Sequence, residues 1–212
     1  CLALVSDLLR LSAQERLELP ARLVGFAKGR GPVVISVGTE STLQAQAFAR
    51  AAQEGGAAAV MAIPPLSRAL SEDQLRAYFE GILEAVEIPL IVQDASSYVG
   101  KAMSIDFQAG LFQRHGQRIL FKPEATPLGP CISALRARTG GQAALFEGSG
   151  GVLLIDSHRR GVKGTIPGVE LLDGPVALWQ ALEAGDEEGY QDGHAHGKGA
   201  GVGRDRQAQK EH

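Results

Sequence analysis

The sequence has few cysteines, no long apolar run and no recognisable leader, and each absence excludes a class of protein. The two cysteines, Cys1 and Cys131, do not form a spacing typical of a metal or redox site, so we expect a reducing, cytoplasmic location. No apolar run approaches the roughly 18 residues that a membrane helix needs. The first residues lack the basic start and small-residue cleavage site of a signal peptide. We therefore expect no membrane partner.

The chain also lacks any large excess of charge of one sign. Its formal net charge is -3 over 212 residues, so the basic surface typical of nucleic-acid-binding proteins is not expected. Hydrophobic residues make up 44% and charged residues 21%, which is ordinary for a globular protein with one sizeable core. The chain begins on Cys1 and not on methionine, and we expect its N-terminus to be missing.

Short apolar runs alternate with helical patterns along most of the chain. Capping boxes at 12–15 and 71–74 predict two helix starts, because each serine can cap a backbone N–H while the Glu or Gln reaches back. Pro20 lies inside the first of these helices, where it removes one hydrogen bond and can kink the segment. The expected strands are 2–5, 32–38, 57–63, 89–94, 119–122, 143–147 and 161–166, and the expected helices are 12–28, 41–54, 71–86, 104–114, 130–139, 152–159 and 171–184.

This alternation predicts a parallel sheet with right-handed crossovers. Parallel strands covered by helices on one side close most naturally into a (β/α)8 TIM barrel, and the seven expected strands leave that barrel one short. We expect the first βα unit and the C-terminal helices to be missing. A doubly wound open sheet is the alternative, but its Gly-rich dinucleotide turn follows none of the strands, since 148–151 has neither the spacing nor the acidic partner.

Composition divides the chain into a partial barrel domain, 1–188, and a tail, 189–212. The tail has glycines among charges and histidines and almost no large apolar side chain, so we expect it to be disordered. His194 and His196 suggest a metal site, but no second ligand cluster stands nearby in the sequence, and we expect no metal. An equally good hypothesis is that residues 189–212 come from a shifted reading frame in the gene.

Lys122 is the residue around which we predict the chemistry. It follows the apolar run 119–121 and precedes a proline, which places it near the carboxyl end of a buried strand, where α/β folds carry their sites. Burial disfavours an ammonium ion, and only a neutral amine attacks a carbonyl to form a Schiff base. The alternative is a lysine that extends to solvent. Glu124 could tune the lysine or cap the next helix, and Glu147 could face the site or bond to a loop.

Seven stretches occur in the order and spacing of one known family. They are 11–16, 31–42, 56–65, 88–92, 122–125, 146–148 and 161–166. In these the chain resembles, from about Leu2 to Glu188, the dihydrodipicolinate synthase and N-acetylneuraminate lyase family of class I aldolases. The resemblance implies a barrel whose Lys122 forms an imine with pyruvate or another 2-oxo acid, without a cofactor. It also implies a homo-oligomer as a possible assembly.

Three positions depart from the family pattern. Where the family usually has a relay tyrosine at the end of the fifth strand, the sequence has Gln93, whose amide can orient a water or bind a carboxylate but cannot shuttle protons. In the stretch aligned with the carboxylate-binding loop only Ser6 offers a hydroxyl, and Asp7 repels a carboxylate unless it points away. Tyr98 stands where the synthases often have an arginine for the second substrate.

We therefore predict a Schiff-base lyase or aldolase acting on pyruvate or another small 2-oxo acid. The predicted catalytic residues are Lys122 and Gln93, and the predicted substrate-binding residues are Ser6, Asp94, Gly148 and Ile166. Overall similarity favours a dihydrodipicolinate synthase-like enzyme, whereas the missing tyrosine favours a sugar-acid dehydratase or retro-aldolase. An incomplete barrel that acts as a sensor or is inactive is the hypothesis from another class.

Overall fold

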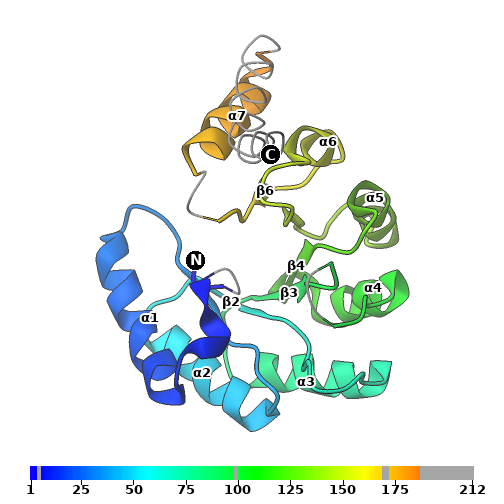
Figure 1. The fold of residues 1–212 in the computed structure, drawn as a ribbon. Helices are drawn as coiled ribbons and strands as arrows, with labels where there is room; N and C mark the ends of the chain where they lie inside the picture. The colour runs from blue at the N-terminus through cyan, green and yellow to red at the C-terminus, as the bar shows by residue number, and fades with distance from the viewer. Residues whose placement is uncertain (4–5, 98–99, 169–171, 187–212) are drawn as a thin grey trace, which may run out of the picture.

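A computed structural model describes residues 1–3, 6–97, 100–168 and 172–186, which form one curved array of parallel strands with helices on its outer side (Figure 1). The strands are β1 (Val34–Ser36), β2 (Ala59–Ala62), β3 (Leu90–Asp94), β4 (Ile119–Pro123), β5 (Phe146–Glu147) and β6 (Gly164–Thr165). The helices are α1 (Ala13–Ala27), α2 (Thr42–Glu54), α3 (Glu72–Glu84), α4 (Ile105–His115), α5 (Leu128–Arg138), α6 (Leu154–Arg159) and α7 (Asp173–Ala184), with short 3₁₀ turns η2 (Leu8–Arg10) and η3 (Gly116–Arg118).

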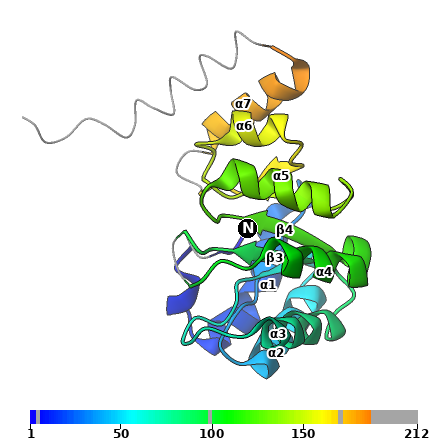
Figure 2. The ribbon, with the colours of Figure 1, turned by 90° about the vertical axis from the view of Figure 1, so that its right-hand side faces the viewer.

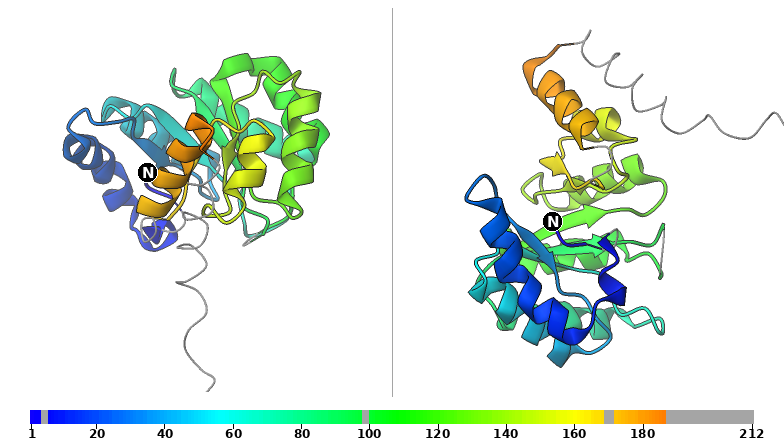
Figure 3. Two further views of the ribbon diagram at one scale, coloured as in Figure 1. Left: turned by 90° about the horizontal axis from the view of Figure 1, so that it is seen from above. Right: turned by 60° about the vertical axis from the view of Figure 1, so that its left-hand side comes forward.

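The strands lie side by side in the order of the sequence, and every pairing is parallel. β1 to β4 form one sheet and β5 and β6 another, and a bridge between Phe121 and Leu145 joins the two. The helices follow in the same order, with α4, α5, α6 and α7 stacked along one side (Figure 2). This confirms the barrel class predicted from the alternation. Between β6 and the N-terminal segment no strand pairing joins the described residues, and α1 and α7 lie at the two ends of an open ring (Figures 1 and 3).

Several predicted strands are shorter than expected. Of the strand predicted at 2–5, Leu2 pairs with Ile35, and residues 4–5 lie outside the described part of the chain. β5 and β6 have two residues each, because only 146–147 and 164–165 form a continuous ladder. The tail predicted to be disordered, 189–212, also lies outside the described residues.

The first helix runs from Ala13 to Ala27 without a break at Pro20, where the proline removes one backbone hydrogen bond. The side chain of Arg16, one helical turn before Pro20, makes tertiary contacts that hold the helix in place. The guanidinium of Arg16 is buried, donates to the carbonyl oxygens of Ser36 and Gly38 at 3.3 and 3.0 Å, and lies 4.1 Å from the ring centre of Phe48. These contacts with the end of β1 and with α2 offset the hydrogen bond that the proline removes.

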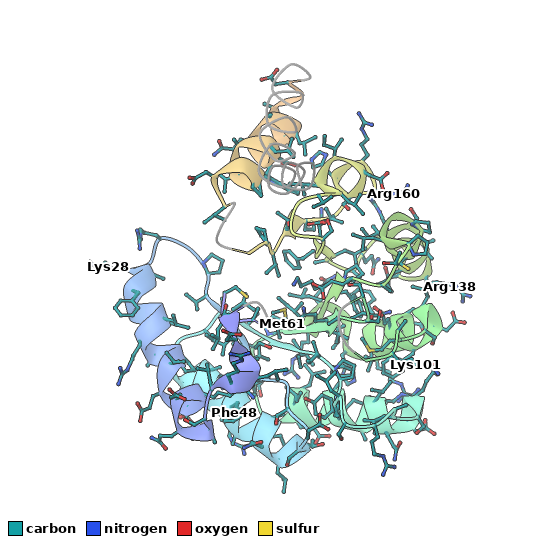
Figure 4. All side chains as sticks on the ribbon, viewed as in Figure 1. Lys28, Phe48, Met61, Lys101, Arg138 and Arg160 are labelled. Carbon is teal, nitrogen blue, oxygen red and sulfur yellow. The ribbon has the colours of Figure 1, made fainter. Side chains whose placement is uncertain are left out.

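Side chains alternate between two apolar layers, and this alternation fixes which residues face the barrel interior. Along β4, Ile119 and Phe121 pack against the helices, whereas Leu120 belongs to an inner cluster with Met61 and Ile91. Figure 4 shows Met61 inside the ring and Arg138 and Arg160 pointing outward. Lys122 follows Leu120 by two residues and therefore shares the interior face.

The cap of α3 gives a direct test of local stability. Ser71 Oγ accepts from the backbone N–H of Gln74 at 3.3 Å, and Gln74 Oε1 accepts from the N–H of Ser71 at 3.0 Å. We expect Ser71→Ala to lower the free energy of unfolding by about 1 kcal/mol, since one helix N–H loses its acceptor. Urea unfolding followed by circular dichroism measures this change. Ser97→Ala, at an exposed loop serine, is the control and is expected to leave the midpoint unchanged.

Candidate active site

The interior face of β3 and β4 carries a buried lysine and a buried glutamine, and both contact a buried glutamate that follows β4. Lys122 Nζ lies 2.7 Å from Glu124 Oε1, and Gln93 Nε2 donates to Glu124 Oε2 at 3.0 Å. The three residues are 5%, 6% and 2% exposed. A carboxylate that touches an ammonium and an amide in a buried position can take a proton from one and be oriented by the other.

Strand register explains why Gln93 and Lys122 meet. The two residues are direct partners in the parallel ladder between β3 and β4, and both follow an inner apolar residue by two positions, Ile91 in one strand and Leu120 in the other. The amide oxygen of Gln93 is buried, and no described residue donates a hydrogen bond to it. That oxygen can therefore accept a hydrogen bond from a molecule bound beside Lys122.

Glycine at position 148 makes room for the glutamate. A Cβ placed on Gly148 would lie 2.3 Å from Glu124 Cγ and 2.8 Å from its Oε1, far closer than nonbonded atoms approach. The backbone of Gly148 thus approaches the Glu124 side chain so closely that only glycine allows this placement of the carboxylate. The predicted approach of this backbone to a ligand stays a prediction.

Asp94, a predicted substrate-binding residue, uses both carboxylate oxygens within its own loop. Oδ1 accepts from the N–H of Ser96 and Oδ2 from the N–H of Met103, each at 3.1 Å. Burial, and secondarily the charge of Asp94, raises the pKa of the Cys131 thiol. Asp94 thus holds the two ends of the loop after β3, and its binding of substrate stays a prediction.

Ser6 and Ile166, the other predicted binding residues, have no direct hydrogen bond or ion pair to the lysine, glutamate and glutamine in the described structure. Ser6 is exposed, and its backbone N–H donates to the carbonyl of Ala3 at 2.9 Å. Ile166 packs in the inner cluster with Leu120 and Phe146, on the same interior face as Lys122. Their roles in binding also stay predictions.

Glu147, for which the sequence left two roles open, is fully buried and bonds to the loop that follows it. Oε1 accepts from the N–H and the hydroxyl of Ser149, and Oε2 accepts from Thr165 Oγ1 at 2.6 Å and from the N–H of Gly151 at 3.2 Å. The structural interpretation is therefore confirmed. Glu124, for which the sequence also left two roles open, contacts Lys122 and does not cap α5, whose N-cap residue is Pro127.

A cavity of about 540 Å³ opens beside Glu124 and Gly148, between the loops that follow β4 and β5. The described residues contain no group of three or more His, Cys, Asp or Glu side chains arranged to hold a metal ion. In the same part of the chain, none of the helices has the length and apolar character to cross a membrane. The arrangement can supply a buried amine, a carboxylate next to it and a space for a small organic molecule.

Comparison with protein families gives one match over most of the chain. The model of the dihydrodipicolinate synthetase family matches residues 7–186. Among curated proteins, L-2-keto-3-deoxyarabonate dehydratase from Azospirillum brasilense is 30% identical over 199 residues, which are 92% of this chain and 63% of that protein. The 4-hydroxy-tetrahydrodipicolinate synthase from Azoarcus sp. strain BH72 is 40% identical over 82 residues, 39% of this chain and 28% of the synthase.

Solved structures share the fold at low sequence identity. Dihydrodipicolinate synthase from Acinetobacter baumannii, determined in complex with pyruvate, superposes with a TM-score of 0.81 at 23% identity, covering 91% of this chain and 66% of the synthase. This likeness shows the fold. The chain spans less than two thirds of the length of each of these three proteins.

Proposed function

The chain belongs to the dihydrodipicolinate synthetase family, and we propose that it is a Schiff-base-forming lyase of the class I aldolase type that acts on pyruvate or another small 2-oxo acid. The observation that supports this most strongly is the buried contact of Lys122 with Glu124, on the interior face of the barrel. A lysine held there by a single carboxylate is placed to lose its proton to that carboxylate when a carbonyl compound binds.

The proposed chemistry uses the two oxygens of Glu124 as a local proton store. Oε1 accepts a proton from the Lys122 ammonium, and the neutral amine then adds to the ketone carbon of the 2-oxo acid. The protonated Glu124 returns this proton to the hydroxyl of the resulting adduct, which leaves as water and gives the imine. Gln93 Nε2 keeps the carboxylate in place through its 3.0 Å hydrogen bond.

Dehydration of a sugar acid is the finer assignment that the site favours. The imine makes the adjacent C–H acidic, and Glu124 can remove that proton and then return it to the hydroxyl on the next carbon, which leaves as water. Gln93 at the end of β3 cannot relay protons as a tyrosine would, but its free amide oxygen can orient the departing hydroxyl or a water. The dehydratase from Azospirillum brasilense, which matches 92% of this chain, supports this choice over the synthase.

Borohydride trapping tests the imine directly. We expect incubation with pyruvate and sodium cyanoborohydride to add one reduced pyruvate per chain, mapped by peptide mass to Lys122, because reduction makes the imine bond permanent. Lys122→Arg should give no adduct, whereas Lys163→Arg, which changes an exposed lysine beside β6, should trap as well as the unaltered chain. An absence of adduct with pyruvate and a panel of 2-oxo acids, on protein with a cooperative thermal transition, would leave the inactive-barrel hypothesis.

Product analysis separates dehydration from aldol cleavage. With L-2-keto-3-deoxyarabonate as substrate, dehydration keeps all the carbon atoms in one product, whereas cleavage releases pyruvate and an aldehyde. We expect a single product lighter than the substrate by one water. Release of pyruvate, detected with lactate dehydrogenase and NADH, would favour the retro-aldolase.

Gly148→Ala tests whether the position of Glu124 sets the rate. The added methyl group must displace the Glu124 side chain, and we expect the rate of trapping by pyruvate to fall about 100-fold, as misplacement of a reacting group by about 1 Å commonly causes. Gly110→Ala in α4, where a Cβ meets nothing within 4 Å, is the matched control and should trap normally. Equal rates in the two variants would show that Glu124 does not limit imine formation.

A further inference from the structure

The cavity beside Glu124 points to the chemistry of the substrate's far end. Resting on the proposed function, we propose that the 2-oxo acid used by this chain carries a single carboxylate and an uncharged distal group, which lies in the cavity between the loops after β4 and β5. The cavity adjoins the carboxylate that contacts Lys122, because Glu124 and Gly148 are part of its wall. A molecule bonded to Lys122 therefore has room to extend in this direction.

Charge at the cavity wall disfavours a second carboxylate. Two carboxylates line it, Glu124 and Asp156, and none of its described lining residues is a lysine or arginine. The hydrogen bond from Arg160 lowers the pKa of Asp156, so Asp156 is ionised at neutral pH. Arg160 itself is engaged, since its Nε lies 2.7 Å from Asp156 Oδ2 and its Nη1 donates to Ser133 Oγ at 2.7 Å. A distal carboxylate would meet like charge without a partner.

Apolar side chains on two facing loops make up much of the remaining wall. Pro127 lines it from the loop after β4 and Leu128 from the first turn of α5, and Val152 and Leu153 line it from the loop after β5. Val152 is 73% exposed and Leu153 is 43% exposed, although both are large apolar residues. A carboxylate placed against these side chains would lose hydration without gaining a partner, which supports an uncharged distal group.

Two acids of similar size test the charge directly: 4-methyl-2-oxopentanoate, with an apolar end, and 2-oxoglutarate, with a carboxylate end. Each is trapped with cyanoborohydride at a series of concentrations, and each rate is divided by the rate at which the same acid modifies free Nα-acetyl-lysine. We expect half-maximal trapping on Lys122 at a concentration at least tenfold lower for 4-methyl-2-oxopentanoate than for 2-oxoglutarate. Equal or stronger trapping of 2-oxoglutarate would overturn the proposal.

A cation placed in the wall should reverse this preference. Leu153→Lys introduces an ammonium at a partly exposed position that tolerates a polar side chain, and we expect about tenfold stronger trapping of 2-oxoglutarate. Trapping of pyruvate, which has no distal group, is measured in the same variant as the reference to which both rates are normalised. An unchanged ratio of the two acids in Leu153→Lys would show that the distal group lies elsewhere. If pyruvate itself were not trapped on Lys122, the proposed function would be rejected. If pyruvate were trapped but the two larger acids were trapped equally well, only the proposal on the distal group would be rejected.

Discussion

Glu124→Gln is expected to lower turnover of a 2-oxo acid substrate by about 10³-fold, within the range typical for the loss of a general acid–base group. The amide has nearly the same shape as the carboxylate, but it cannot take the proton from Lys122 or return it to the leaving hydroxyl. Because the substrate carboxylate and carbonyl do not depend on Glu124 for binding in this scheme, KM should change much less than kcat. Steady-state kinetics on purified protein measures both.

The control for this variant must separate chemistry from folding. Removal of one partner of a buried ion pair lowers the free energy of unfolding by about 3 kcal/mol or more unless the remaining group loses its charge. The variants therefore differ in stability, and the kcat of each variant is measured at a temperature below its own thermal transition. Glu124→Asp keeps a carboxylate on a shorter side chain, and we expect it to recover part of the lost rate. If Glu124→Gln kept the kcat of the unaltered chain and still formed the trapped imine, Glu124 would only balance the charge of Lys122. Another group would then carry out the proton transfers.

The sequence predicted Lys122 from its place at the end of an apolar strand, and it predicted Gln93 from the position of the relay tyrosine in the resembled family. Alternation places them on one face, and the register of β3 and β4 makes them direct neighbours. The family resemblance pointed to the same two positions. The barrel class followed from the regular alternation of strands and helices along the chain. This alternation can be recognised in the sequence without knowledge of side-chain contacts or of a ligand.

The partners of Glu124, Glu147 and Gly148 could not be predicted in the same way. Whether Glu124 turns toward Lys122 or caps the helix after it depends on side-chain rotamers and on the space left by Gly148, which comes from another strand end. The hydrogen bonds of Glu147 reach Thr165, 18 residues away, and depend on how β5 and β6 pair. Contacts between loops that are distant in the sequence are set by packing, and local patterns do not report them.

Glu147→Ala is expected to lower the free energy of unfolding by about 3 to 5 kcal/mol, because four donors lose their acceptor inside the protein. These donors are the N–H and hydroxyl of Ser149, the N–H of Gly151 and the hydroxyl of Thr165. They come from the loop after β5 and from β6, a two-residue strand whose only described partner is β5. The loss should therefore concentrate at this end of the array, and hydrogen exchange followed by mass spectrometry should show faster exchange over 146–168 than over β1 to β4.

Glu183→Ala is the matched control, since Glu183 also bonds to a side chain of another helix, His158 Nε2 at 2.9 Å, but is 60% exposed. An exposed pair contributes about 1 kcal/mol or less, so its urea midpoint should stay close to that of the unaltered chain. Glu147→Gln keeps one acceptor oxygen and should fall between the two. If Glu147→Ala were no less stable than Glu183→Ala, water would be replacing the Glu147 carboxylate as the acceptor. The stability of β6 would then not depend on Glu147. If Glu147→Gln retained pyruvate trapping on Lys122 while its exchange over 146–168 increased, the loop-holding role of Glu147 would be separated from the chemistry at Glu124.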